Sequence, residues 1–135
     1  MLHHKKNSKK LRVSFDFDDT LCLIDNPFDR SYSTSYDIFP NKEMIKKFLE
    51  YKNTDGIVYI VSSRLKIPDN FKDIRSFCEL NKLDPEAIYL TDFDYKVNTL
   101  DALNIDIHYD DNIEEIEMIK RYAPQIETVH VKPSI

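Results

Sequence analysis

The unbroken apolar run from Ile57 to Val61 restricts the fold of this chain more than any other stretch of its sequence. A strand with one face in water alternates apolar and polar residues, whereas a run without alternation predicts a strand that is covered on both faces. Strands of that kind are typical of parallel sheets, in which helices pack against both sides. The run closes at Ser62, so a polar side chain stands at the end of a buried strand.

Segments with strand and helix patterns alternate along the rest of the chain. Apolar and β-branched residues predict strands at residues 11–17, 57–61, 87–90, 105–109 and 126–131. Apolar stripes at helical spacing predict helices after the cap residue Asn41, from Pro68, from Lys96, and after the cap residue Asn112. Short connections favour right-handed crossovers. The pattern therefore predicts an α/β, three-layer Rossmann-like fold with a parallel sheet of about five strands between helical layers.

The length of 135 residues is that of one domain. Residues 1–10 carry four lysines and no periodicity, so we expect a flexible basic tail before a single domain at residues 11–135. Within that domain, residues 22–40 lack a helical period and predict a loop or short hairpin that forms a flap over the end of the first strand.

The net charge and the rarer residues exclude several classes of function. A net charge of −5 argues against a protein dedicated to nucleic-acid binding, although it leaves room for a local basic patch. Gly56 is the only glycine, which excludes the phosphate loops that need several. Cys22 and Cys78 stand in no metal-like spacing and follow no secretory segment, so we expect reduced thiols in a cytoplasmic protein. No apolar run approaches the ~20 residues of a membrane helix, so we expect no membrane partner.

Polar residues collect at the predicted ends of the strands, where ligands bind in folds of this type. Crowded carboxylates raise one another's pKa, so they need either a compensating cation or exposure to solvent. Oxygen ligands without histidine or cysteine suit Mg²⁺, which binds together with substrate phosphates. The polar residues at the predicted strand ends are Asp16 and Asp18 after the first strand, Ser62 after the second, Lys96 after the third, and Asp110 and Asp111 after the fourth.

Four motifs in chain order resemble those of the haloacid dehalogenase-like (HAD) phosphohydrolases. The stretch DFDDTL at residues 16–21 resembles the DxDx[T/V][L/V] motif, and Ser62 resembles the second motif, a hydroxyl residue that ends an apolar strand. Lys96 and the aspartate pair at residues 110–111 resemble the third and fourth motifs. The resemblance spans residues 11–131 and implies a phosphatase of the small, capless type, since no stretch has room for a large cap domain.

The resemblance also implies catalytic roles. Asp16 would be the nucleophile that forms an aspartyl-phosphate, and Asp18 the general acid and base. Ser62 and Lys96 would bind the phosphoryl oxygens of the substrate, and Lys96 would also offset the crowded carboxylates. Beside them, Ser63 and Arg64 are further substrate-binding candidates; Arg64 either reaches a second substrate phosphate or pairs with an acid.

A Mg²⁺ site follows from the same resemblance. In the family, the ligands are the carboxylate of the first motif aspartate, the backbone carbonyl of the second and the fourth-motif aspartate. In this chain those residues are Asp16, Asp18 and Asp110, and Asp111 would hold a water molecule on the ion. An intact Asp18 favours hydrolysis as the outcome.

An open site suits a phosphorylated substrate that is a small molecule or a nucleic-acid end. Arg30, Tyr32 and Tyr36 in the expected flap either stack on a base or sugar or serve as packing residues of the loop. Compact HAD proteins, including the phosphatase domain of polynucleotide kinases, share this outline. A nucleotide or polynucleotide 3'-phosphate is therefore the expected substrate.

Other interpretations remain open for single residues and for the whole chain. The pair at 110–111 alone also suits a helix cap, and Lys96 alone a surface lysine. A phosphoacceptor receiver domain has five parallel strands and a Lys-Pro like that at 132–133, but its acceptor follows the third strand rather than the first. A catalytically idle HAD fold used for binding is the second alternative, against which intact Asp16 and Asp18 argue.

Overall fold

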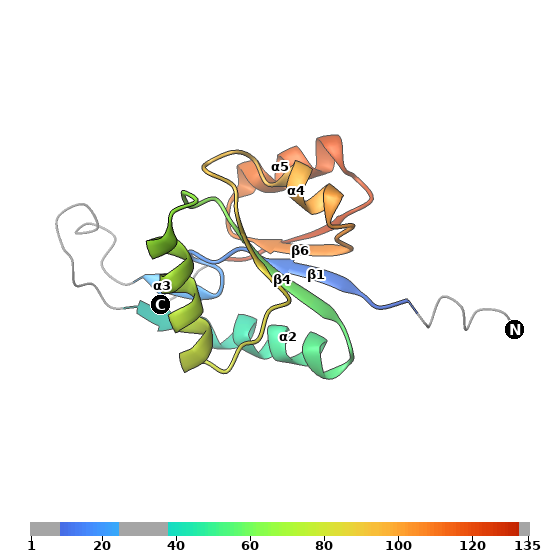
Figure 1. Ribbon diagram of the computed structural model, residues 1–135. Coiled ribbons are helices and arrows are strands. Elements are labelled where there is room, and N and C mark those ends of the chain that lie inside the picture. Colours follow the sequence, from blue (N-terminus) through green and yellow to red (C-terminus); the bar gives the residue numbers. More distant parts are fainter. Residues whose placement is uncertain (1–8, 25–37, 133–135) are drawn as a thin grey trace, which may run out of the picture.

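The computed structural model describes residues 9–24 and 38–132, and within them a five-stranded parallel sheet forms the centre of the fold (Figure 1). The strands lie in the order β5-β4-β1-β6-β7, and every neighbouring pair is parallel. The predicted α/β fold class is confirmed. The strands are β1 (Arg12–Phe15), β4 (Ile57–Ser62), β5 (Ile88–Leu90), β6 (Ile107–Asp110) and β7 (Glu127–His130).

Helices cover both faces of this sheet, which makes three layers (Figure 1). One face packs against α2 (Lys42–Asn53) and α3 (Pro68–Leu80), the other against α4 (Val97–Ala102) and α5 (Ile113–Tyr122). Each layer has its own apolar core. Alternate residues of β4 serve the two cores: Val58 and Ile60 face α2 and α3, and Tyr59 and Val61 face α4 and α5. All four are buried, so the apolar run of β4 is covered on both faces as predicted.

Asparagine side chains cap two of the helices, as the sequence predicts. Asn41 accepts a hydrogen bond from the backbone N–H of Met44 at the start of α2. Asn112 accepts from the N–H groups of Glu114 and Glu115 at the start of α5. Both caps satisfy donors that have no partner within the first helical turn. The second cap fixes the chain directly after the Asp110-Asp111 pair.

The chain turns earlier after β1 than predicted. The strand ends at Phe15 rather than at residue 17, because the carbonyl of Phe17 accepts hydrogen bonds from the N–H groups of Thr20, Leu21 and Cys22 and closes a tight turn. The other predicted strands differ from the observed ones by one or two residues at an end. Asp16 is therefore the first residue beyond the strand.

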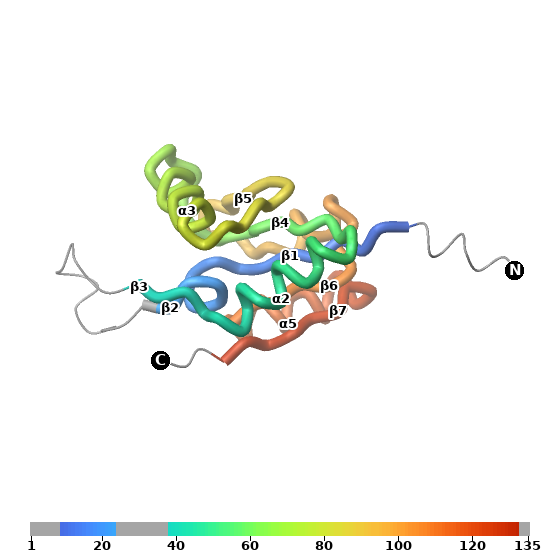
Figure 2. Tube along the Cα trace, turned by 90° about the horizontal axis from the view of Figure 1, so that it is seen from below, coloured from blue at the N-terminus to red at the C-terminus, as the bar shows by residue number. Residues whose placement is uncertain are grey.

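The ends of the expected flap form a second, antiparallel sheet of two strands. Strand β2 (Cys22–Ile24) pairs with β3 (Ile38–Pro40). This pair lies at the end of the molecule where β1 terminates, on the side away from the N-terminus (Figure 2). Residues 25–37, with Arg30, Tyr32 and Tyr36, and residues 1–8 of the expected tail lie outside the described residues. Within the described residues, no helix has the length and apolar character to span a bilayer.

Candidate active site

The turn after β1 directs successive side chains to different sides of the sheet. The N–H of Asp16 still donates to the carbonyl of Tyr109 at 2.9 Å, so Asp16 keeps its place beside β6. Phe17 points into the opposite core, where its ring meets Phe77 edge-on at 5.1 Å. Asp18 lies beyond the strand. Asp19 completes the turn with φ 62°, a left-handed conformation that aspartate adopts more readily than most residues.

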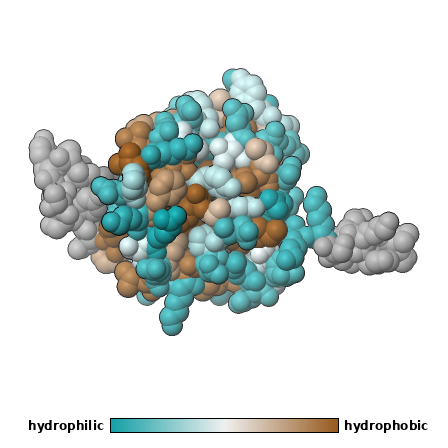
Figure 3. Space-filling model, in the orientation of Figure 1, coloured by the Kyte–Doolittle hydropathy of each residue, from teal (hydrophilic) through white to brown (hydrophobic). Residues whose placement is uncertain are grey.

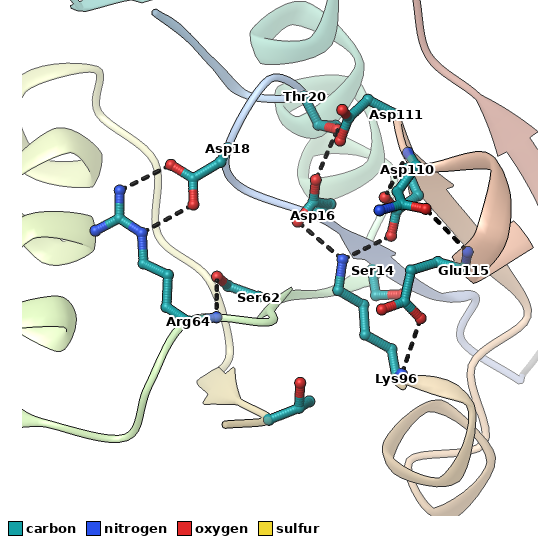
Figure 4. Close-up of polar contacts among 12 residues, drawn as sticks. Ser14, Asp16, Asp18, Thr20, Ser62, Arg64, Lys96, Asp110, Asp111 and Glu115 are labelled. Atoms are coloured by element: carbon teal, nitrogen blue, oxygen red, sulfur yellow. Dashed lines mark hydrogen bonds and ion pairs between the residues drawn. The ribbon is translucent and has the colours of Figure 1, made fainter. Parts of the chain in front are cut away.

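A buried lysine joins two of the predicted site acids (Figure 4). The Nζ of Lys96 lies 2.9 Å from Asp16 Oδ1 and 2.7 Å from Asp110 Oδ2. The exposed side-chain fractions are 2% for Lys96, 7% for Asp16 and 0% for Asp110. Charges this deep are tolerated only when they are paired and hydrogen-bonded. The structure therefore rules out the reading of Lys96 as a surface lysine.

The pKa values of this buried group follow from burial and pairing. Burial by itself would lower the pKa of Lys96, but the charges of Asp16 and Asp110 outweigh it and raise the pKa. Burial would raise the pKa of Asp110, yet the hydrogen bond from His108 and the charge of Lys96 hold it at about 2. Lys96 and Asp110 are therefore both charged at neutral pH.

Three carboxylates form a cluster that could bind a metal ion. Asp16, Asp110 and Asp111 each offer one oxygen, and these three atoms lie within 4.8 Å of one another. Burial, followed by the hydrogen bond to Asp16 and the charge of that group, raises the pKa of Asp111 to about 8. Burial also raises the pKa of Asp16, against the opposing effect of Lys96. One lysine thus does not offset three crowded carboxylates, so Asp111 keeps a proton at neutral pH in the metal-free protein. An all-oxygen cluster of this kind suits a hard divalent cation, which would displace that proton.

Buried polar residues that the sequence did not single out support this cluster. Ser14 Oγ lies 2.6 Å from His108 Nδ1, and His108 Nε2 lies 2.8 Å from Asp110 Oδ2. Each of these two residues stands two positions before a site aspartate on its strand, and a period of two is the signal that could have identified them. Glu115 accepts a hydrogen bond from the N–H of Lys96 at 2.9 Å. It therefore holds the start of α4 against α5 and is more than a favourable charge in the first turn of α5.

Thr20 links the turn to the carboxylate cluster. Its hydroxyl donates to Asp16 Oδ2 at 3.1 Å and lies 3.4 Å from Asp111 Oδ1. Asp16 thereby has a donor on each carboxylate oxygen, Lys96 on one and Thr20 on the other. Its orientation is fixed from two sides.

Asp18 lies apart from this cluster and pairs with Arg64 instead (Figure 4). The Nε and Nη2 atoms of Arg64 donate to the two carboxylate oxygens of Asp18 at 2.8 and 2.7 Å. The guanidinium also stacks over the ring of Phe17, 5.3 Å from its centroid. The side chains are 23% and 35% exposed for Arg64 and Asp18. Of the two roles open to Arg64 in the sequence, the structure shows pairing with an acid.

The hydroxyl residues at the end of β4 differ in their surroundings. Ser62 is 1% exposed, and its Oγ accepts the N–H of Arg64 at 3.2 Å. It lies at the rim between Asp16 and the Arg64 loop (Figure 4). The carbonyl of Ser63 accepts a hydrogen bond from the N–H of Phe93. Ser62 is thus buried at the end of β4, whereas the contact of Ser63 ties its backbone to the loop after β5.

A cavity of about 610 Å³ adjoins Arg64. The rings of Phe17 and Phe77 line it together with Ile38 and Leu80, and Arg64 stands between it and Asp18. Ile38 and Leu80 are exposed. On the face of the molecule in Figure 3, apolar residues lie interspersed among hydrophilic ones. The site therefore combines a charged, buried end with a more apolar, open one.

Two solved structures share this architecture. A chain of "Structure of Pnkp1/Rnl/Hen1 complex" matches with a TM-score of 0.71 and 18% identity over 93% of this chain and 46% of that chain. A chain of "Structure of the Pnkp1/Rnl/Hen1 RNA repair complex" matches with a TM-score of 0.71 and 17% identity over 92% and 43%. This protein thus spans less than half the length of either chain, and identities this low show the fold alone. No protein-family model and no curated protein matches the sequence.

Proposed function

We propose that this protein is a HAD-like, Mg²⁺-dependent phosphomonoester hydrolase that acts through an aspartyl-phosphate. The observation that carries the proposal is the position of Asp16. Its carboxylate lies at the end of the central strand, is held by Lys96 and shares a cluster with Asp110 and Asp111. The order of these residues along the chain is that of the HAD motifs.

Asp16, Asp110 and Asp111 are the side chains that would hold the metal ion, with the backbone carbonyl of Asp18 as a further ligand. Their donor set fits, since it offers oxygen atoms only and carries more negative charge than Lys96 neutralises. When bound, Mg²⁺ would neutralise negative charge on the phosphoryl oxygens of the substrate and on the carboxylates around it.

Asp16 would attack the phosphorus atom of the substrate. A bond forms between its carboxylate oxygen and phosphorus, and the bond between phosphorus and the leaving oxygen breaks. Asp18 gives its proton to that leaving oxygen. Water then attacks the aspartyl-phosphate, Asp18 takes up a proton from it, and inorganic phosphate and free Asp16 result.

Lys96 and Ser62 would bind the phosphoryl oxygens during transfer. The ammonium group has three donors, and Asp16 and Asp110 use two of them. The third remains for a phosphoryl oxygen. The hydroxyl of Ser62 already accepts a hydrogen bond from the backbone, so its own proton can be donated to a second oxygen. Donors that are fixed in advance stabilise the charge of the transition state.

Arg64 would control the availability of Asp18. It engages both oxygens of that carboxylate, so one must be released before Asp18 can reach the leaving oxygen. Arg64 could then turn to a second phosphate of the substrate. Ser63, next to Arg64, is a further substrate-binding candidate in this proposal.

A nucleotide or polynucleotide 3'-phosphate is the substrate that we favour. The leaving group would lie on the Asp18 side of the site, where the cavity beside Arg64 offers a base an apolar surface that includes the exposed side chains of Ile38 and Leu80. The similar fold found in chains of an RNA repair complex supports the same choice. Cys22 and Cys78 are both buried and are not joined in a disulfide. We propose a cytoplasmic location for this protein.

Phosphate release tests the proposal. The substrates are a 3'-phosphorylated oligonucleotide, a nucleoside 3'-phosphate and a sugar phosphate, each with Mg²⁺ and with EDTA. We expect Mg²⁺-dependent turnover that Asp16→Asn reduces by about 10³-fold or more, because the nucleophile is lost. Asp84→Asn, at an exposed position away from the site, is the matched control. Absence of turnover on every substrate, or a full rate in Asp16→Asn, would overturn the proposal.

The cavity beside Arg64 gives a test of the substrate class. Ser76 lines the cavity from the exposed side of α3, so Ser76→Trp would fill it. We expect a raised KM for the oligonucleotide and an unchanged KM for the sugar phosphate. Glu79→Trp, an exposed residue of the same helix outside this cavity, controls for the added ring. An equal change of KM for both substrates would argue against a base in the cavity.

A further inference from the structure

We propose that Ser14 and His108 are positioning residues that orient the Asp110 carboxylate for metal binding. The inference rests on the proposed function in one respect only, the metal site formed with Asp16 and Asp111. Neither Ser14 nor His108 belongs to the three-carboxylate cluster, and His108 reaches it through a hydrogen bond to Asp110. They act through Asp110, and they do so from the interior of the sheet.

The sheet register brings this pair under the site. Strands β1 and β6 are parallel neighbours, and Ser14 stands directly opposite His108 in their pairing. Two residues further along each strand come Asp16 and Asp110, which therefore point to the same face. Ser14 and His108 have exposed fractions of 0%. The pair thus forms a buried polar layer directly below the two carboxylates.

Hydrogen bonds connect this layer to one oxygen of Asp110. Oδ2 takes both the His108 Nε2 contact at 2.8 Å and the Lys96 Nζ contact at 2.7 Å. Oδ1 accepts the backbone N–H of Asn112 at 3.0 Å. A carboxylate oxygen has about two lone-pair directions, so Oδ2 is fully used and Oδ1 keeps one for another ligand. His108 and Lys96 together occupy Oδ2, which leaves Oδ1 as the oxygen of Asp110 that can bind a metal ion.

Ser14 in turn fixes the orientation of the imidazole ring. An ionised carboxylate only accepts, so the Nε2 of His108 donates to Asp110. The other ring nitrogen, Nδ1, lies 2.6 Å from the Ser14 hydroxyl, so the ring is held by a hydrogen bond at each nitrogen. A fixed ring orientation is what second partners of metal ligands commonly supply.

A role in packing alone does not account for these residues. Neighbouring positions in the core on the same face of the sheet are filled by apolar side chains such as Val61 of β4 and Leu100 of α4. Burying a hydroxyl and an imidazole in that layer is less favourable than burying apolar groups of equal size, even when each is hydrogen-bonded. The hydrogen-bonded chain from Ser14 to Asp110 therefore serves the orientation of the carboxylate.

Metal binding to the isolated protein tests this inference without reference to phosphate release. Mn²⁺ is titrated into metal-free protein and its Kd is measured by calorimetry. We expect His108→Phe to raise the Kd about 10- to 100-fold, the usual effect of losing such a partner. His108→Gln, which can keep a donor toward Asp110, should recover most of the affinity. Ser14→Ala should give a smaller increase.

Ile119→Val, a substitution in the apolar core on the same face of the sheet, controls for a general loss of packing and should leave the Kd unchanged. If His108→Phe does not fold, Ser14→Ala decides the question. Equal Kd values in wild type, Ser14→Ala and a folded His108→Phe would overturn the inference, and so would wild-type protein that binds no Mn²⁺. Metal binding with the expected order of Kd values but no phosphate release would leave it standing while the hydrolase proposal failed.

Discussion

The two ion pairs of the site, Lys96 with its aspartates and Arg64 with Asp18, contrast in depth and in constraint. Lys96 is 2% exposed and is held by Asp16 and Asp110 at once. Arg64 and Asp18 are 23% and 35% exposed, and the arginine holds both oxygens of its partner alone. The Lys96 pairs are buried against the sheet, whereas the Arg64 pair lies at the edge of the sheet and is partly open to solvent.

This difference separates groups that must stay in place from groups that must move. A buried charge that loses its partner has no water to replace it, so the Lys96 network is costly to disturb. An exposed pair exchanges its partner for water or for another anion at little cost. In the proposed reaction, Asp16 needs a fixed position, whereas Asp18 has to leave Arg64 to reach the leaving oxygen. The depth of each pair matches its proposed task.

Removing the buried cation should have the largest effect on stability. We expect Lys96→Met to lower the free energy of unfolding by about 3 to 5 kcal/mol in metal-free buffer, because Asp16 and Asp110 are left as unpaired buried charges. Urea unfolding measures this loss. Lys120→Met, at an exposed position of α5, should change it little. A loss below about 1 kcal/mol in Lys96→Met would show that the two pairs do not differ in the way that their burial indicates.

The surplus charge of the carboxylate cluster should appear as a pH dependence of intermediate size. The pKa of Asp111 is about 8 in the folded, metal-free protein against 3.8 for an ordinary aspartate. The folded state therefore binds the proton more tightly, and stability falls as pH rises from about 4 to about 8. Bound Mg²⁺ requires the deprotonated carboxylates. We expect the difference in Tm between samples with Mg²⁺ and with EDTA to grow across this range.

Asp111→Asn removes the titrating carboxyl and should flatten the Tm profile in EDTA. A Tm difference that stays constant with pH in the wild-type protein would contradict the assignment of surplus charge to this cluster. The comparison of the two ion pairs would then lose its electrostatic basis.

Breaking the partly buried pair of Arg64 and Asp18 should have the smallest effect on stability and a large one on the reaction. We expect Asp18→Asn to change the free energy of unfolding by less than about 1 kcal/mol, because water reaches both side chains of this pair. Phosphate release should fall by about 10²- to 10⁴-fold, because the general acid is lost. Urea unfolding and initial rates on the same samples measure both. A stability loss as large as that of Lys96→Met would show that this pair is structural.

Local patterns were enough to predict the layered sheet and the strand ends that carry the site. The uninterrupted apolar run of β4 indicated burial on both faces, and Val58 and Val61 are each fully buried against a different helical layer. Asn41 and Asn112 were recognisable as caps because capping depends on residues a few positions away. The exact end of β1 could not be recognised from the sequence, because the turn closed by the Phe17 carbonyl leaves no mark in the pattern of apolar residues.

The supporting residues of the site were harder to find from the sequence. Ser14 and His108 stand 94 residues apart and form a pair only because β1 and β6 lie side by side in one register. Glu115 lies in the first turn of α5, yet it accepts a hydrogen bond from the backbone of Lys96 at the start of another helix, α4. Each of these contacts depends on how two elements pack, and no local pattern records that.

The apolar run of β4 and the polar residues after each strand thus determined the sheet and the edge at which Asp16, Ser62, Lys96 and Asp110 would meet. Hydrophobic periodicity acts over a few residues, so the sequence shows it directly. Only the tertiary structure decided that Lys96 joins Asp16 to Asp110 and that Asp18 turns to Arg64. Strand order and helix packing set the pairing of the charged side chains, because an ion pair depends on distances of a few ångströms between segments far apart in the chain.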